Sequence, residues 1–163
     1  MATDPSPDIE LIDLSGYSAP LGVRLSMFNM LSVVIDPYTH QSGWIIPTAA
    51  RLFWHYQEAD IRCGFIVASD ADGARSYLDS YVDAHQVLLD PDRELISSME
   101  LQSLPALVHI RQDASLAACA EGWDAADWRV VLDGVEEAMD WRSKPALPIT
   151  GDPGSFAGTP ALG

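Results

Sequence analysis

The sequence predicts an α/β fold in which a central mixed sheet lies between helices, a three-layer α/β/α arrangement. Three observations lead to this prediction. Residues 28–69 read as strand, helix, strand, which makes a parallel pair with a crossover helix. Residues 106–121 contain two apolar runs around a polar turn, the pattern of an antiparallel hairpin. An amphipathic helix follows the hairpin and is the last element expected to pack on the sheet.

Length and charge restrict the possible functions. A chain of 163 residues fits one domain with a sizeable core. Its formal net charge of -15 argues against binding to nucleic acid or to an anionic membrane, because both need a basic face. We expect the acidity to serve solubility or to match a basic patch on a partner.

The first residues also bear on location. They show neither the basic nor the apolar region of a signal peptide. No apolar run approaches the roughly 20 residues of a spanning helix. Two cysteines far apart in the sequence suggest a reduced setting, so we expect a cytoplasmic protein.

The first half of the chain contains the parallel unit. Residues 1–27 are expected to form an N-terminal arm with at most a short edge strand. The strand that follows ends in a continuous apolar run, as in sheets that are buried on both faces. The expected elements are a strand at 28–36, a helix at 43–58 that Pro47 should kink, a strand at 62–69, and a helix capped by Ser69 or Asp70.

The second half contains shorter elements and the hairpin. A domain spanning 28–144 is therefore expected, followed by a disordered Pro/Gly-rich tail at 145–163, whose composition cannot support a core of its own. The expected elements are an apolar run at 87–89, a turn at 90–92, a brief helix at 93–99, hairpin strands at 106–110 and 116–121, and a helix that starts at Asp124 and buries Trp128, Val131, Leu132, Val135 and Met139.

Two small hydroxyl residues, Thr39 and Ser42, follow the first long strand. Open α/β sheets place their ligand sites at the carboxyl ends of their strands, so this T-x-x-S pair is the first candidate site. Ser42 beside His40 suggests a nucleophile and base, but no third orienting group and no G-x-S-x-G elbow accompany them. We expect Ser42 or Thr39 to cap the helix instead.

The ordered set of elements resembles the thioredoxin superfamily, especially its thiol–disulfide oxidoreductase and alkyl hydroperoxide reductase branch. Pro47 lies eight residues after Thr39, as the family's kink proline lies after the first cysteine of C-x-x-C. Residues 87–93 are similar to the segment before the family's cis-proline strand. Residues 104–110, Leu-Pro-Ala-Leu-Val-His-Ile, are similar to that strand, which would make Pro105 the cis-proline. The resemblance covers residues 28–141.

The resemblance places Thr39 on the attacking cysteine and Ser42 on the resolving one. In the family's T-x-x-C version Thr39 matches, and Ser42 replaces the peroxidatic cysteine. A hydroxyl is too weak an acid to ionise in the field of a helix N-terminus, and an oxygen cannot form a mixed disulfide. We therefore expect a degenerate C-x-x-C in a redox-inactive domain. Asp36 matches the buried acid that some relatives keep, but it has no thiol to deprotonate.

The cysteines and the possible metal ligands suggest two enzymatic alternatives. The first is a thiol oxidoreductase or peroxidase that uses Cys63 or Cys119, although both lie within strands and are expected to pack as small hydrophobic side chains. The second is a metal enzyme. The four histidines lack the spacing of a zinc site and the aspartates lack the register of a calcium loop, so we expect no metal and no cofactor.

The resemblance also implies a binding surface. In the family, the motif loop and the cis-proline loop form a shallow groove that pairs with an extended peptide. The leading hypothesis is thus a protein-binding or assembly module with an unidentified protein or peptide partner. A weaker one is a homo-oligomer whose groove is filled by residues 146–163. The expected surface consists of Tyr38, Thr39, His40, Trp44, Leu104 and Pro105.

Overall fold

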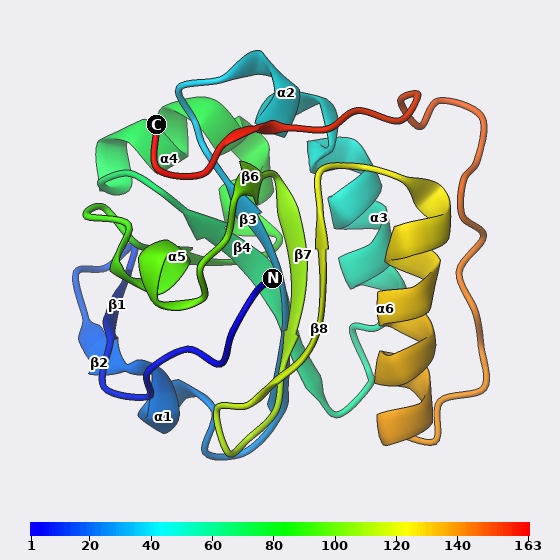
Figure 1. Cartoon of the computed structure of the whole chain (residues 1–163), viewed down its shortest axis with the longest axis horizontal. Coiled ribbons are helices and arrows are strands. Elements are labelled where there is room, and N and C mark those ends of the chain that lie inside the picture. The colour runs from blue at the N-terminus through cyan, green and yellow to red at the C-terminus, as the bar shows by residue number, and fades with distance from the viewer.

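The computed structural model describes all 163 residues and has a mixed seven-stranded sheet at its centre, with helices on both faces (Figure 1). The sheet order is β2-β1-β5-β4-β3-β7-β8. Its strands are β1 (Glu10–Asp13), β2 (Ser18–Pro20), β3 (Asn29–Ile35), β4 (Ile61–Val67), β5 (Gln86–Leu89), β7 (Ala106–Ile110) and β8 (Leu116–Glu121). The two remaining strands, β6 (Ser103–Leu104) and β9 (Thr159–Pro160), pair with each other.

The helices are short apart from the last one. They are α1 (Leu21–Arg24), α2 (His40–Trp44), α3 (Ile46–His55), α4 (Ala71–Leu78), the 3₁₀ helix η1 (Asp79–Asp83), α5 (Glu94–Ser98) and α6 (Ala125–Ala138). None has the length and apolar character needed to cross a membrane.

Two apolar clusters make the layers. Alternate residues of β3 point to opposite faces, so Val33 belongs to one cluster and Val34 to the other. The larger cluster joins the sheet to α3, α4 and α6, and the smaller one joins the other face to α1 and α5. The continuous apolar run of β3 therefore reflects burial on both faces, and the expected three-layer architecture is confirmed.

The strand pairing also matches the sequence prediction. β4 pairs in parallel with β3, and β5 extends the parallel part. The hairpin of β7 and β8 joins antiparallel on the other side of β3. The final helix begins after Asp124, whose carboxylate caps it by accepting a hydrogen bond from the Asp127 N–H.

The helix expected at 43–58 is two helices. α2 ends at Trp44 and α3 begins at Ile46, so the break lies ahead of Pro47. Pro47 has no N–H to donate to the preceding turn, and its ring would collide with that turn's carbonyl. Proline is well accommodated in the first turn of a helix, which is where α3 begins.

The N-terminal arm is more ordered than we expected. Its strands β1 and β2 extend the central sheet, with β1 antiparallel to β5. Leu11 and Leu21 are fully buried and anchor the arm in the smaller cluster. Residues 10–24 thus belong to the domain rather than preceding it.

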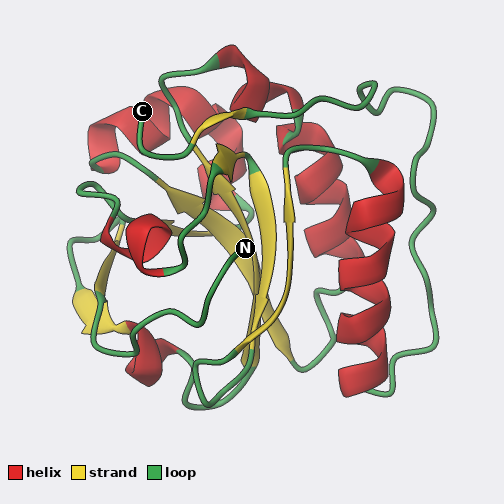
Figure 2. Ribbon diagram, viewed as in Figure 1, coloured by secondary structure: helices red, strands yellow, loops and turns green.

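The tail (residues 145–163) also differs from the expectation of disorder. It rises past α6, crosses the molecule beside α2 and α3, and ends near α4 (Figure 1). Figure 2 shows β9 as a short strand beside β6 on this path. The composition argument failed because the tail is not held by a core of its own. Its polar groups are satisfied by residues from elsewhere in the chain.

Candidate functional site

The candidate site lies where the carboxyl end of β3 meets the amino end of β7. Val34 of β3 pairs with Ala106 of β7, so the loop after β3 and the Leu104–Pro105 peptide reach the same edge of the sheet. The Leu104–Pro105 peptide bond is cis. The motif loop (residues 36–42) and the β6 edge (Ser103 and Leu104) are thus neighbours, as the sheet topology requires.

The two hydroxyls of the motif loop are both engaged. Ser42 is fully buried, and its Oγ accepts a hydrogen bond of 3.0 Å from the Asp36 N–H. Thr39 occupies the N-cap position of α2, but its side chain caps nothing and donates instead to the Asp36 carbonyl over 3.2 Å. The prediction that one of these oxygens caps the helix is therefore wrong. Both hydroxyls instead fix the turn at Asp36.

Asp36, the first residue of the motif loop, is 2% exposed. Its Oδ1 accepts the Tyr38 N–H over 2.9 Å, and its Oδ2 lies 2.9 Å from an Arg93 guanidinium nitrogen. The Arg93 side chain is 18% exposed. The pair supplies each buried charge with its counter-charge.

The nearby Tyr77 completes the packing under this loop. Its hydroxyl donates to the Thr39 carbonyl. Burial, followed by the negative charge of Asp36, raises the pKa of Tyr77 to about 12. Tyr77 thus remains a neutral donor at any physiological pH.

The tail occupies the β6 edge. Leu104 pairs with Thr159, Ser103 pairs with Pro160, and both pairings are antiparallel. The Ala161 N–H donates to the Gln102 carbonyl over 2.9 Å, and the Ala161 carbonyl accepts from Arg93 over 2.6 Å.

An aromatic contact and a second set of hydrogen bonds hold the tail ahead of β9. Phe156 lies edge-to-face against Trp44, with ring centroids 5.5 Å apart. It also exchanges two backbone hydrogen bonds, of 2.8 and 2.9 Å, with Trp123. The Trp123 indole donates to the Pro153 carbonyl over 2.7 Å.

Farther back, Asp152 anchors the tail on α3. Its carboxylate accepts from Arg51 over 2.8 Å and from Thr48 over 2.7 Å. The Asp152 side chain is only 5% exposed, so this contact is well shielded from water. The tail therefore has one anchor on α3 and another at the β6 edge.

No protein-family model matches the sequence, and no curated protein is similar to it in sequence. Solved structures do match. A secreted Mycobacterium tuberculosis disulfide oxidoreductase aligns with a TM-score of 0.61 and 18% identity over 80% of this chain and 96% of its own. The thioredoxin domain of a Bacteroides vulgatus thiol-disulfide oxidoreductase aligns with a TM-score of 0.65 and 14% identity, over 85% of this chain and 99% of its own. The fold is thioredoxin-like. At these identities the similarity establishes the fold and not the activity.

Within this thioredoxin-like fold, some of the expected groove residues lie beside the tail and others are exposed to solvent. Leu104 and Pro105 are buried, and Trp44 is 53% exposed although it contacts Phe156. Tyr38 and His40 are exposed, and their side chains form no hydrogen bond within the chain. The structure thus brings Trp44 and Leu104 to the tail. The sequence prediction named the tail only as the groove's occupant in a homo-oligomer, and it missed Arg93 and Trp123. A lone cation among the acids at 90–94 was the available signal for Arg93.

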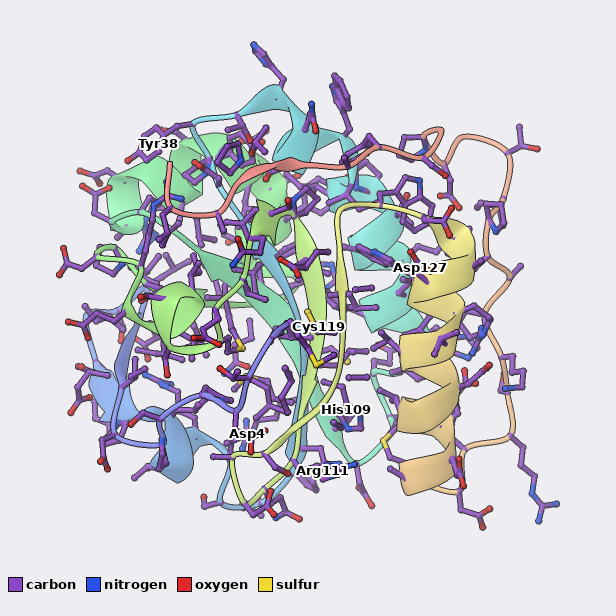
Figure 3. The ribbon with its side chains drawn as sticks, in the orientation of Figure 1. Asp4, Tyr38, His109, Arg111, Cys119 and Asp127 are labelled. Carbon is purple, nitrogen blue, oxygen red and sulfur yellow. The ribbon has the colours of Figure 1, made fainter.

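Neither cysteine belongs to the site. Cys63 packs with the larger apolar cluster and Cys119 with the smaller one, so they lie on opposite faces of the sheet. Figure 3 shows Cys119 in the middle of the view, away from Tyr38, which lies at the end that carries α2. Burial raises the pKa of the Cys63 thiol to about 12, and burial together with the charge of Glu121 does the same for Cys119. Both thiols are free and protonated at neutral pH.

Proposed function

We propose that this thioredoxin-like domain performs no thiol–disulfide exchange and works as a protein-binding or assembly module. The observation that carries the proposal is Ser42. At the motif position the hydroxyl is fully buried and engaged with the Asp36 backbone, where exchange chemistry would need an accessible, ionisable sulfur.

The alternative, a thiol oxidoreductase or peroxidase that uses Cys63 or Cys119, has less support. The two sulfurs lie on opposite faces of the sheet, so they cannot pair with each other without refolding. A thiol of raised pKa is also a poor nucleophile at neutral pH, because only the thiolate attacks a disulfide.

The binding half of the proposal draws on the β6 edge. This edge offers backbone donors and acceptors to an extended chain, and its pairing with β9 of the same chain supports the proposal. Trp44 adds a half-exposed aromatic beside it, the type of residue that often anchors a partner. We infer an extended protein segment as the partner class. The two free thiols are consistent with the reducing, cytoplasmic setting proposed from the sequence.

An insulin-reduction and peroxide-consumption assay on the purified protein tests the redox half. We expect rates equal to those without protein. Turnover that disappears in Cys63→Ser or Cys119→Ser would refute the proposal and favour the alternative. A Thr39→Cys/Ser42→Cys double variant is the matched comparison, because activity gained there would show that the assay detects a working motif on this scaffold.

Affinity capture tests the binding half. The wild-type chain and Trp44→Ala are compared, with Trp54→Ala on α3 as the control, because Trp54 is also exposed, at 66%. We expect a partner that is retained by wild type and Trp54→Ala and lost from Trp44→Ala. The same partners on all three proteins would contradict a site at Trp44.

A further inference from the structure

The β6 edge is already occupied by the chain's own tail. We propose that residues 156–161, Phe-Ala-Gly-Thr-Pro-Ala, are an intramolecular ligand that closes this edge. We further propose that the edge binds in trans extended segments of the same chemistry: an aromatic residue, a glycine two positions later, and small residues after it. This inference rests on the proposed binding function and specifies its ligand and its regulation.

The first argument is the backbone pairing. The tail pairs antiparallel with Leu104 and Ser103, and hydrogen bonds at Trp123 and Gln102 extend the contact on either side. Such bonds recognise an extended chain whatever its side chains, as when a peptide adds a strand to an open sheet edge. The edge therefore accepts a strand from any source that meets its steric limits.

The second argument is a steric limit at Gly158. Its φ is +92°, a backbone conformation that favours glycine, and a Cβ there would lie 2.7 Å from the Leu104 carbonyl oxygen. Gly122, on the opposite side of the contact, is equally restricted, since its Cβ would lie 2.6 Å from the Ala157 carbonyl oxygen. The two backbones approach each other too closely for a side chain at either position.

The third argument is that the contacts on either side of Gly158 favour particular side chains. Phe156 meets the edge of Trp44, which gives the aromatic position a partner. Ala161 is 2% exposed and packs in the smaller apolar cluster, so a larger side chain there would have to displace buried neighbours. Its carbonyl is held by Arg93, whose guanidinium is oriented by the buried Asp36. Leu162, which follows, is 65% exposed and imposes no requirement.

The fourth argument is that the closure is local and reversible. Of residues 156–161 only Ala161 is fully buried and Phe156 is partly buried against the larger cluster, so the apolar side chains released when this part lifts off are chiefly these two. The anchor of Asp152 on Arg51 and Thr48 does not depend on it. A lifted segment would stay tethered at high effective concentration, so a competing peptide binds weakly until the segment is disabled.

The test uses the full chain and a fluorescent peptide of residues 153–163, followed by anisotropy. Gly158→Ala should release the tail and bind the peptide, and wild type should bind it at least tenfold more weakly. Gly154→Ala is the matched control, because a Cβ there meets nothing within 4 Å, and it should behave as wild type. Equal binding by all three proteins, or binding by none, would overturn the proposal.

A second measurement uses the altered peptide. The same peptide with Gly158→Ala should bind the Gly158→Ala protein at least tenfold more weakly than the natural one, and equal affinity would overturn the steric argument. Should the Gly158→Ala protein fail to fold by circular dichroism, Phe156→Ala takes its place as the released chain, with the same expectations.

Three outcomes separate this inference from its alternatives. Light scattering should find the wild-type protein monomeric; a dimer that dissociates in Gly158→Ala would show that a second copy supplies the strand, and would overturn closure within one chain. Peptide binding alongside thiol turnover would leave this inference standing and refute the proposed redox inactivity. If the peptide does not bind and no thiol turnover is seen, this inference is refuted and the proposed redox inactivity stands.

Discussion

Arg93 joins the motif loop to the tail. One of its guanidinium nitrogens lies 2.9 Å from the Asp36 carboxylate, and the other donates to the Ala161 carbonyl over 2.6 Å. Asp36 is 2% exposed and also receives the Tyr38 N–H. The motif loop and the strand that covers the β6 edge thus depend on the same cation.

Replacing this cation should therefore destabilise the protein strongly. We expect Arg93→Met to lower the free energy of unfolding by about 3 kcal/mol, because Asp36 then remains buried without its counter-charge. Urea unfolding measures the loss. In a double-mutant cycle with Asp36→Asn, we expect a coupling energy of at least about 1 kcal/mol. Strictly additive losses would show that the two side chains act independently.

A second buried carboxylate gives a prediction on the other side of the sheet. The Tyr56 hydroxyl donates to Glu136 over 2.6 Å, and both residues are buried. Tyr56→Phe should cost about 2 kcal/mol of stability, the usual worth of a hydrogen bond to a charged group. Thermal and urea unfolding give the measurement. Tyr38→Phe is the control and should change nothing, since Tyr38 is 71% exposed.

His109 should make the protein acid-sensitive. Burial, and after it the charge of Arg111, lowers the pKa of His109 to about 4, against 6.5 for an unperturbed imidazole. Below about pH 6.5 the unfolded chain binds a proton that the folded chain refuses, so stability falls until the pH reaches the folded pKa. The loss should total about 3 kcal/mol between pH 7 and pH 4.

Unfolding at a series of pH values, for wild type and His109→Gln, isolates this contribution. The two proteins should differ in their pH dependence between pH 7 and pH 4 and run parallel above pH 7, where the imidazole is neutral in both states. A titration of His109 by NMR with a midpoint near 6.5 would contradict the prediction. The side-chain nitrogen of Asn29 lies 3.2 Å from His109 Nε2, so the Asn29 signals should shift with the same midpoint as those of His109.

The two thiols should be nearly inert in the folded protein. With the pKa of each raised to about 12, the thiolate fraction at pH 8 is on the order of 10⁻⁴, so alkylation should be about 10³-fold slower than in the unfolded chain. Iodoacetamide labelling read by mass spectrometry, with and without denaturant, measures the ratio. Rapid labelling of either cysteine in the folded state would support the thiol-enzyme alternative.

The fold could be predicted from sequence because its signals are local. The apolar run of β3, the hairpin of β7 and β8 and the cap at Asp124 each lie within a few consecutive residues. The motif loop and the Leu104–Pro105 segment were found for the same reason. Trp44 and Leu104 both lie beside the tail, because the carboxyl end of one strand and the amino end of an antiparallel neighbour must meet.

The tail's anchors within its own chain could not be predicted because its partners are remote. Its composition indicates disorder, and no pattern within residues 145–163 reveals that Asp152 meets Arg51 or that Ala161 meets Arg93. The hydroxyls of Thr39 and Ser42 were assigned to helix capping for a related reason. Residue type predicts a preference for caps, but the buried turn at Asp36 offers these hydroxyls closer partners.

The separation between the tail and its partners has a consequence for folding order. Asp152 bonds to Thr48 across 104 residues of chain, and Ala161 to Arg93 across 68. Sheet contacts of similar range, such as Val33 with Leu107, bury the core and so compensate the closure entropy of the intervening chain. The tail contacts are mostly polar and half-exposed, so they compensate it less and should form later. We expect the sheet to assemble first with the β6 edge unpaired, and pulse-labelled hydrogen exchange should find Ala161 protected after Val33. For that interval the newly folded domain would present an open strand to whatever peptide is nearby.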